Sequence, residues 1–233
     1  MKWAAMKQAA LNRSALGRDQ SGGVLVEVSI LLPMIITVIF GSVDLLYALY
    51  QWNAAAKAVE VGARIAAVSD PIAAGLNGLT NSVAMSLNAA GQPLAMPAFT
   101  VSCNGETATC TCAGTCTSLA ANPYDAVAMN RLVFGRGSTD CGDATSYYAT
   151  GMCDVLPSIK AANVIVVYQQ SGLGYAGRPG GPQPTIVVSL QNMKFQFFFL
   201  SYLLGASVPM PPMTTTITAE DLCSGGGRGS CGS

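Results

Sequence analysis

The sequence feature that most constrains this chain is the apolar stretch at residues 21–50. This stretch, SGGVLVEVSILLPMIITVIFGSVDLLYALY, has one carboxylate near each end, Glu27 and Asp44. A helix of about 20 residues crosses the hydrocarbon core of a bilayer, so residues 24–50 are long enough to span a membrane. The excess of basic over acidic residues before the stretch predicts a single pass with a cytoplasmic N-terminus. The basic residues are Lys2, Lys7, Arg13 and Arg18.

The two carboxylates need an explanation, because an acid inside a membrane is costly and usually functional. Asp44 lies near the far end of the stretch, where it is expected to reach headgroups and water. Glu27 follows a glycine pair, and cleavage between Gly22 and Gly23 would place it fifth in the mature chain. In an assembled fibre, its carboxylate would then neutralise the new N-terminal amine of a neighbouring subunit. A glycine at this point also lets a protease approach the backbone.

The helix is expected to continue past the membrane over residues 51–68 and to end at Asp70–Pro71. It would then be about 45 residues long, or about 68 Å at 1.5 Å per residue. Pro33 lacks a backbone N–H and is expected to kink the helix, either as a tolerated membrane proline or as a bend needed for packing. The acidic Glu60 has basic residues at the spacings that stabilise a helix face. The expected apolar stripe consists of Val61, Ile65 and Val68.

The rest of the chain alternates between apolar and polar residues in short segments, which is typical of strands in an antiparallel sheet. A helical turn is expected within residues 123–134, with Asn122 as its cap, and residues 106–118 are expected to form a stapled hairpin or loop. The predicted strands are 99–103, 163–170, 185–193 and 214–219.

A second apolar block, FQFFFLSYLLGASV at residues 195–208, is too short to span a bilayer. One interpretation places it in the core of the head domain. The other makes it a patch that faces the membrane or a partner protein. The first interpretation is the expected one.

The composition argues against several classes of function. Charged residues make up 10% of the chain, the formal net charge is zero, and histidine is absent. A nucleic-acid-binding protein would need a concentrated basic face, which the sequence lacks. Without histidine, the commonest general base and most zinc and haem sites are also missing. We therefore expect no catalytic residues, no metal, no cofactor and no small-molecule substrate.

All eight cysteines follow the apolar stretch. An even number on one side of a membrane span indicates disulfides in an oxidising compartment. The alternative is a metal cluster at Cys110, Cys112 and Cys116, but this spacing is not that of paired CxxC motifs. Expected short-range pairs are Cys141–Cys153 and Cys223–Cys231, with the remaining four pairing among themselves. The candidates for disulfides are Cys103, Cys110, Cys112, Cys116, Cys141, Cys153, Cys223 and Cys231.

Residues 21–68 resemble the N-terminal region of TadE-like proteins, which are minor pseudopilins of the tight-adherence (Tad/Flp) pilus system. The basic leader, Gly22 and an acid at the fifth mature position also resemble a class III prepilin signal. The matching positions are Glu27, Leu32–Pro33, Phe40–Gly41 followed by Asp44, and Val59–Glu60–Val61–Gly62–Ala63–Arg64.

The resemblance implies that a prepilin peptidase cuts between Gly22 and Gly23, and that Glu27 acts in processing or assembly. The implied partners are other pilins, pilus-assembly platform proteins and the lipid bilayer. The implied function is that of a TadE-like minor pseudopilin, a non-enzymatic component in assembly of a Tad/Flp-type pilus that serves adhesion, biofilm formation or secretion. The alternative is an uncleaved single-pass membrane protein with a disulfide-rich adhesive or binding ectodomain unrelated to pili.

The expected fold is α+β and pilin-like, with a long N-terminal transmembrane helix followed by a small antiparallel-sheet head with disulfides. Residues 1–22 would be a cytoplasmic leader, residues 23–70 would contain the helix, and residues 71–233 would form the extracytoplasmic head. We expect the protein in the inner (cytoplasmic) membrane, with its head in the periplasm or outside the cell.

Overall fold

The structure is a computed structural model that describes residues 21–76, 98–116, 119–142, 150–173, 183–205 and 207–219. The chain divides into two compact units. We call the first the stem unit, which comprises Met1–Ala48 and Phe197–Ala206. The second, which we call the head unit, comprises Leu49–Gln196 and Ser207–Ser233.

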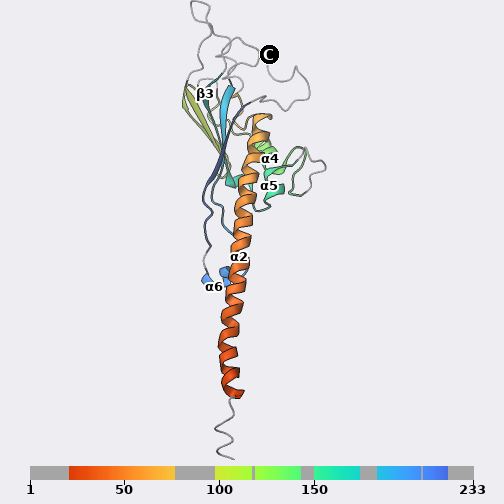
Figure 1. The fold of residues 1–233 in the computed structure, drawn as a ribbon. Helices are drawn as coiled ribbons and strands as arrows, with labels where there is room; N and C mark the ends of the chain where they lie inside the picture. The colour runs from red at the N-terminus through yellow and green to blue at the C-terminus, as the bar shows by residue number, and fades with distance from the viewer. Residues whose placement is uncertain are drawn as a thin grey trace, which may run out of the picture. The chain divides into compact units, whose positions relative to one another are not determined.

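The N-terminal helix α2 extends without interruption from Ser21 to Ala67, a length of 47 residues (Figure 1). Its length agrees with the helix that the sequence predicts, and it continues on both sides of Pro33. The kink expected at Pro33 stays a prediction. Hydroxyl groups in the apolar part bond within the helix: the Thr37 hydroxyl donates to the Pro33 carbonyl (2.7 Å), and the Ser42 hydroxyl to the Ile39 carbonyl (2.7 Å). Because these hydroxyls are satisfied locally, they cost little in a nonpolar environment.

Within the head unit, α2 packs through its smallest side chains. Gly62 lies in this face, and a Cβ atom there would come within 2.5 Å of the Met152 sulfur, so the Met152 side chain packs directly against the helix backbone at the glycine. The expected stripe was wrong, since Val68 is exposed and Val61 and Ile65 are only partly buried. Alanine and glycine permit a closer approach than the larger residues of that stripe. The buried face contains Ala54, Ala55, Ala58, Val59, Gly62, Ala63, Ala66 and Ala67.

The head unit contains a five-stranded antiparallel sheet with the strand order β2-β1-β3-β4-β5. All four predicted strands are present, and the Thr- and Cys-rich segment forms β2 of a hairpin with β1. Alternate residues of β4 are buried, which is the pattern of a strand with one face on the core. The strands are β1 (Phe99–Asn104), β2 (Thr109–Gly114), β3 (Val164–Leu173), β4 (Gln183–Leu190) and β5 (Met213–Thr218).

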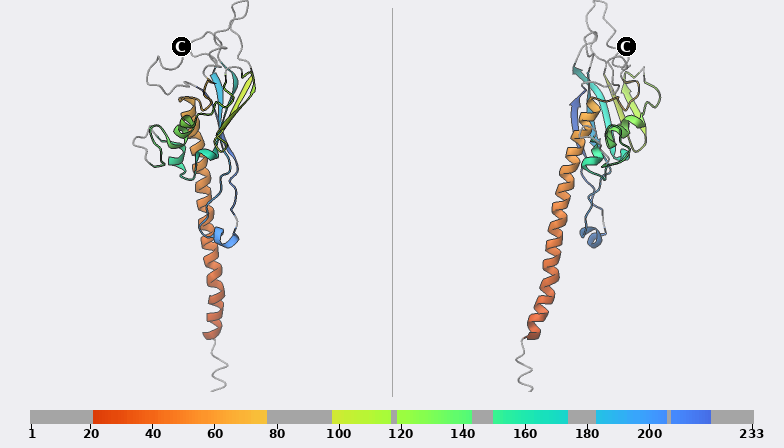
Figure 2. Two further views of the ribbon diagram at one scale, coloured as in Figure 1. Left: turned by 180° about the vertical axis from the view of Figure 1, so that it is seen from behind. Right: turned by 90° about the vertical axis from the view of Figure 1, so that its right-hand side faces the viewer.

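Short helices complete the two units. In the head unit, α4 (Ala126–Phe134) and α5 (Met152–Val155) pack against each other, as Figure 2 shows, and a 3₁₀ turn, η2 (Ala161–Asn163), precedes β3. In the stem unit, α6 (Leu200–Leu204) lies beside α2 (Figure 1).

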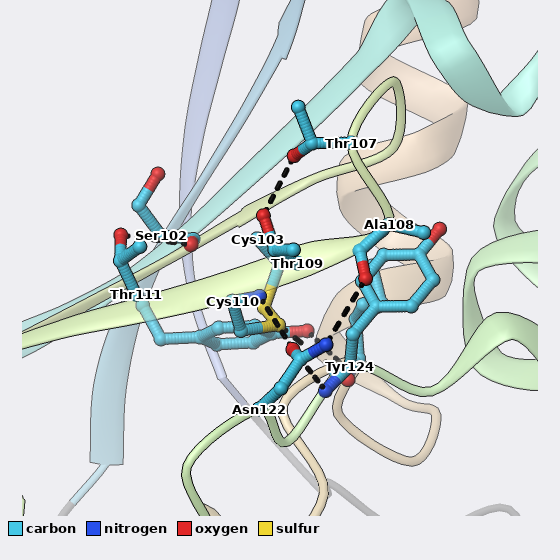
Figure 3. The surroundings of a disulfide bond; sticks show 11 residues. Ser102, Cys103, Thr107, Ala108, Thr109, Cys110, Thr111, Asn122 and Tyr124 are labelled. Atoms are coloured by element: carbon cyan, nitrogen blue, oxygen red, sulfur yellow. Dashed lines mark hydrogen bonds between the residues drawn. A yellow bond between two sulfur atoms is a disulfide. The ribbon is translucent and has the colours of Figure 1, made fainter.

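The cap of α4 differs from the expected one. The Asp125 carboxylate accepts bonds from the backbone N–H groups of Val127 and Ala128, so Asp125 and not Asn122 is the N-cap. The side-chain amide oxygen of Asn122 instead accepts from the backbone N–H groups of Cys110 and Tyr124, which ties the loop before α4 to β2 (Figure 3).

One hydrophobic core joins the buried face of α2 to the sheet and to α4 and α5. Its largest fully buried side chain is Tyr168 on β3. The Tyr168 hydroxyl accepts a hydrogen bond from the backbone N–H of Ile72 (3.0 Å), so its polar atom is satisfied. Burial raises the pKa of Tyr168, because the charged phenolate would lose its hydration.

Three disulfides are present among the described residues. Cys103 and Cys110 face each other across β1 and β2 and are joined (Figure 3), and Cys112 is joined to Cys116. Cys141 pairs with Cys153, which confirms the predicted short-range pair. The three cysteines proposed as an alternative metal cluster are all in disulfides. Cys223 and Cys231 lie outside the described residues, as do leader residues 1–20. Together, these observations confirm the predicted α+β fold with a long apolar helix, an antiparallel sheet and paired cysteines.

Candidate functional site in the stem unit

The residues predicted for processing lie in the first turns of α2. Gly22, Gly23 and Glu27 are all exposed, and a Cβ atom at either glycine would have no neighbour within 4 Å. The carboxylate and the glycine backbone are therefore accessible to another molecule on this end of the helix. Their roles in cleavage and assembly stay predictions.

The second acid, Asp44, is in a different environment from the one that the sequence suggested. It is fully buried, at 0% exposure, and is not accessible to solvent. Its carboxylate accepts hydrogen bonds from three successive backbone N–H groups. The donors are Phe198 (2.8 Å), Phe199 (2.9 Å) and Leu200 (2.7 Å).

This arrangement caps α6 from a distant part of the chain. Phe199 is the N-cap residue of α6 and has no side-chain capping bond of its own. The first N–H groups of a helix lack partners within it, and a carboxylate is a strong acceptor for them. Asp44 therefore binds the N–H group of the first residue of α6, Leu200, and those of the two residues before it.

Aromatic contacts flank the carboxylate on both sides. The rings of Phe40 and Phe199 are stacked, with centroids 4.0 Å apart and an interplanar angle of 9°. The ring centroids of Tyr47 and Phe198 are 4.8 Å apart. Because residues four and three positions apart share a helix face, Phe40, Asp44 and Tyr47 form one surface of α2 that binds the returning segment.

The returning segment is also closed by its own bonds. The Ser201 hydroxyl donates to the Phe197 carbonyl (3.1 Å), and the Gly205 N–H donates to the Ser201 carbonyl (3.1 Å). Gly205 has φ of +61°, a left-handed conformation in which glycine ends a helix without strain. An open groove of about 310 Å³ remains between this segment and α2. Its lining residues are Thr37, Phe40, Gly41, Phe199, Leu200 and Tyr202.

Contrary to the expected interpretation, most of the second apolar block belongs to the stem unit and does not form the core of the head, although Phe195 packs against that core. Phe198 is 57% exposed and Tyr202 is 93% exposed. The sequence could not reveal this, because apolar content alone does not distinguish a core strand from a patch. The absence of alternation in FQFFFL was the available signal, since a strand on a core normally alternates.

In the head unit, the two ends of this block, at residues 195–196 and 208, are held by separate hydrogen bonds. The Gln51 side-chain amide donates to the Gln196 carbonyl (2.7 Å), and the Gln196 N–H donates to the Gln51 side-chain oxygen (2.9 Å). The Phe195 N–H donates to the Val208 carbonyl (2.9 Å), which joins the two ends of the block to each other. Gln51 is buried, and both polar atoms of its side chain bind the backbone of Gln196.

Charged residues of α2 in the head unit form the predicted pairs. Lys57 and Arg64 both contact the Glu60 carboxylate, at 2.7 and 2.5 Å. The hydrogen bond and the charge of Lys57 lower the pKa of Glu60, with a smaller contribution from Arg64. Both pairs are exposed, so they support the helix only modestly.

Residues 22–64 match the family described as TadE-like protein. No curated protein and no solved structure shows a significant match to the chain. The matched segment contains Gly22, Glu27, Pro33 and Asp44, which are among the positions on which the sequence resemblance rests. It also coincides with α2, which among the described residues is the one helix long and apolar enough to cross a membrane. The resemblance is thus confirmed over residues 22–64, and the chain carries a TadE-like N-terminal region.

Proposed function

We propose that this protein is a TadE-like minor pseudopilin, a non-enzymatic, membrane-anchored component in the assembly of a Tad/Flp-type pilus. The observation that carries the proposal is the family match over residues 22–64, because it includes the glycine pair, the acid and the apolar helix together. The match suggests a Tad pilus-associated component. The role in assembly is our inference from the arrangement of these residues.

In this proposal a prepilin peptidase cuts between Gly22 and Gly23 on the cytoplasmic side of the inner membrane. The new amine of Gly23 then meets the Glu27 carboxylate of a neighbouring pilin, which removes two isolated charges from an apolar setting. The exposure of Glu27 and of both glycines on α2 supports this step, since none is covered by the described part of the chain.

The apolar surface of α2 supplies the packing for such an assembly. Large hydrophobic side chains from Val24 to Val43 are exposed all around the helix. This surface suits either lipid or the helices of other pilins. Platform proteins and other pilins are the partners proposed here.

The head would lie in the periplasm or outside the cell, which fits its paired cysteines. Disulfides persist in oxidising compartments and are rare in the cytoplasm. Three pairs are present among the described residues, all beyond α2 in the sequence. This placement makes the chain a single-pass protein with its leader in the cytoplasm.

The proposal is tested by complementation of a strain that lacks this protein. We expect Glu27→Ala and Glu27→Gln to abolish or strongly reduce pili while the protein is still expressed and inserted, because neither side chain can neutralise the neighbouring amine. Val28→Ala, at the adjacent exposed position, is the matched control and should leave pili in place. Normal piliation by the Glu27 variants, or by the strain without the protein, contradicts the proposal.

A further inference from the structure

The segment Phe197–Ala206, which we call the aromatic loop, has an exposed apolar face that the pseudopilin role does not use. We propose that the aromatic loop inserts into the extracytoplasmic leaflet of the bilayer beside α2, as a second membrane-embedded element, and that lipid acyl chains cover its exposed face. This inference goes beyond the pilus function and requires only that α2 spans the membrane.

The loop contacts α2 within the part of the helix that is long enough to span the membrane. Asp44 lies about 30 Å along the helix from Val24, at about 1.5 Å per residue, which equals the thickness of the hydrocarbon core. With Val24 at one boundary of the core, Asp44 lies at the opposite boundary, and Phe40 lies about one helical turn inside it. Tyr47, Tyr50 and Trp52 follow, and such aromatic residues gather at membrane–water interfaces. A loop held at Phe40 and Asp44 lies below that interface.

The loop is composed mainly of aromatic and aliphatic residues. Residues 195–208 contain no charged side chain. Phe198, Phe199 and Tyr202 all expose a large part of their rings. Rings with an apolar body and, for tyrosine, one polar atom prefer the boundary between headgroups and acyl chains. The same face in water would be an aggregation-prone patch.

Several backbone N–H groups of the loop have hydrogen-bond acceptors within the protein. Backbone polar groups in a bilayer must find partners within the protein, because water is absent. Asp44 accepts the N–H groups of Phe198, Phe199 and Leu200, which a loop in water would leave to solvent. The Tyr202 N–H donates to the Phe199 carbonyl (3.1 Å) and the Gly205 N–H is also bonded, so the turn is closed internally.

The groove between the loop and α2 fits an acyl chain better than a protein partner. It is open and apolar, and Gly41 at its base has nothing within 4 Å of the position of a Cβ atom. It offers no charged residue to select a protein partner, and it is continuous with the lipid-length part of α2. A helix from a second copy of this chain is the competing occupant.

The test uses the full-length protein in liposomes made with lipids brominated on their acyl chains, which quench tryptophan at contact. Tyr202→Trp and Phe198→Trp are made separately in a chain whose own tryptophans are replaced, by Trp3→Phe and Trp52→Phe. Val38→Trp on the exposed apolar part of α2 is the positive control, and Val127→Trp on exposed α4 of the head unit is the negative control.

We expect both loop variants to lose fluorescence to an extent comparable with Val38→Trp, with blue-shifted emission, while Val127→Trp is unquenched. Quenching of Val38→Trp without quenching of either loop variant overturns the proposal. Loop emission that stays unquenched and varies with the protein-to-lipid ratio assigns the face to a second copy and also overturns it. Absence of quenching even for Val38→Trp excludes the membrane span itself and overturns the proposal with it. Cleavage at Gly22 is not needed for any of these readouts, so failure of the pseudopilin proposal is distinguished from failure of this one.

Discussion

The Asp44 carboxylate accepts a 2.8 Å hydrogen bond from the backbone N–H of Phe198, which lies 154 residues later in the chain. Two further N–H groups bind the same carboxylate, and ring contacts between Phe40 and Phe199 and between Tyr47 and Phe198 join the same two segments. An acid in an otherwise apolar helix is thereby used to hold a second apolar segment. This relationship gives Asp44 a structural role within a membrane-length helix.

Asp44→Asn is expected to loosen the aromatic loop. An amide has one acceptor oxygen in place of two, and its NH₂ group would face backbone N–H donors of the loop. The amide protons of Phe198, Phe199 and Leu200 should exchange with deuterium more than about tenfold faster, since bonds to a charged acceptor are the stronger class. Hydrogen-exchange mass spectrometry of the protein in membranes measures this. Glu27→Gln, which removes a charge from the same helix, should leave these amides unchanged. Equal protection in Asp44→Asn and the unaltered protein would show that the carboxylate does not hold the loop.

Gly62→Leu is expected to destabilise the head unit by about 1–3 kcal/mol, the usual cost of overpacking a core. The added side chain would meet the buried Met152 sulfur, so one of the two must move. Ala56→Leu, on the exposed side of the same helix, should change stability little. Thermal unfolding in detergent provides the comparison. Since Met152→Ala makes room at the contact, the double variant should recover part of the loss, and failure to recover would place the strain elsewhere.

Tyr168→Phe removes the acceptor for the Ile72 N–H and leaves that buried donor unpaired. A loss of about 1–3 kcal/mol in the free energy of unfolding is expected. Chemical denaturation followed by circular dichroism measures it. Tyr202→Phe removes the hydroxyl of a side chain that is 93% exposed, and it should be close to neutral. Equal effects of the two substitutions would contradict the role given to the Tyr168 hydroxyl.

The same tyrosine makes the head sensitive to alkaline pH. Burial raises the pKa of Tyr168 above its ordinary value of 10.0, so the folded state keeps a proton that the unfolded state releases. Its contribution to stability is fully present below pH 10.0 and is lost as the pH rises above that value. Unfolding measured between neutral and strongly alkaline pH should show this decline. In Tyr168→Phe the decline should be shallower, and an identical slope in both proteins would rule out this tyrosine as its source.

Disruption of the Cys103–Cys110 bridge by Cys103→Ala with Cys110→Ala is expected to lower stability by about 2–3 kcal/mol, as for a short closed loop. The bridge joins directly opposite residues of β1 and β2, so the hairpin should fray first. Denaturant unfolding of the variant and of the unaltered protein under non-reducing conditions measures the difference. In the unaltered protein, thiol titration after denaturation should find none of the six described cysteines free. Detection of eight free thiols would show that the protein contains none of these disulfides.

Most of the fold could be predicted because it depends on local patterns. The length of α2 follows from its apolar run and the stop at Asp70–Pro71, and the four strands follow from alternation. The buried face of α2 was missed because alanine was not expected to form the contact, whereas the close approach at Gly62 selects small residues. The cap of α4 was assigned to Asn122 in place of Asp125, an error of three residues within one loop.

The Asp44 contact could not be predicted for a different reason. Its three partners are backbone N–H groups, which carry no sequence signature, and they lie more than 150 residues away. The available clue was that an acid within a membrane-length helix needs a partner. That clue identifies the residue that needs a partner, and only the folded chain identifies the partner.

The central claim, that this chain is processed and used as a pseudopilin, is tested most directly at its N-terminus. The protein is purified from membranes of cells that contain the prepilin peptidase, and its first residue is determined by mass spectrometry. The account predicts a mature chain that begins at Gly23, and an intact leader in cells without the peptidase or in Gly22→Leu, while Val24→Leu is still cut. An intact leader on the unaltered protein in the presence of the peptidase would contradict the account and leave an uncleaved single-pass membrane protein.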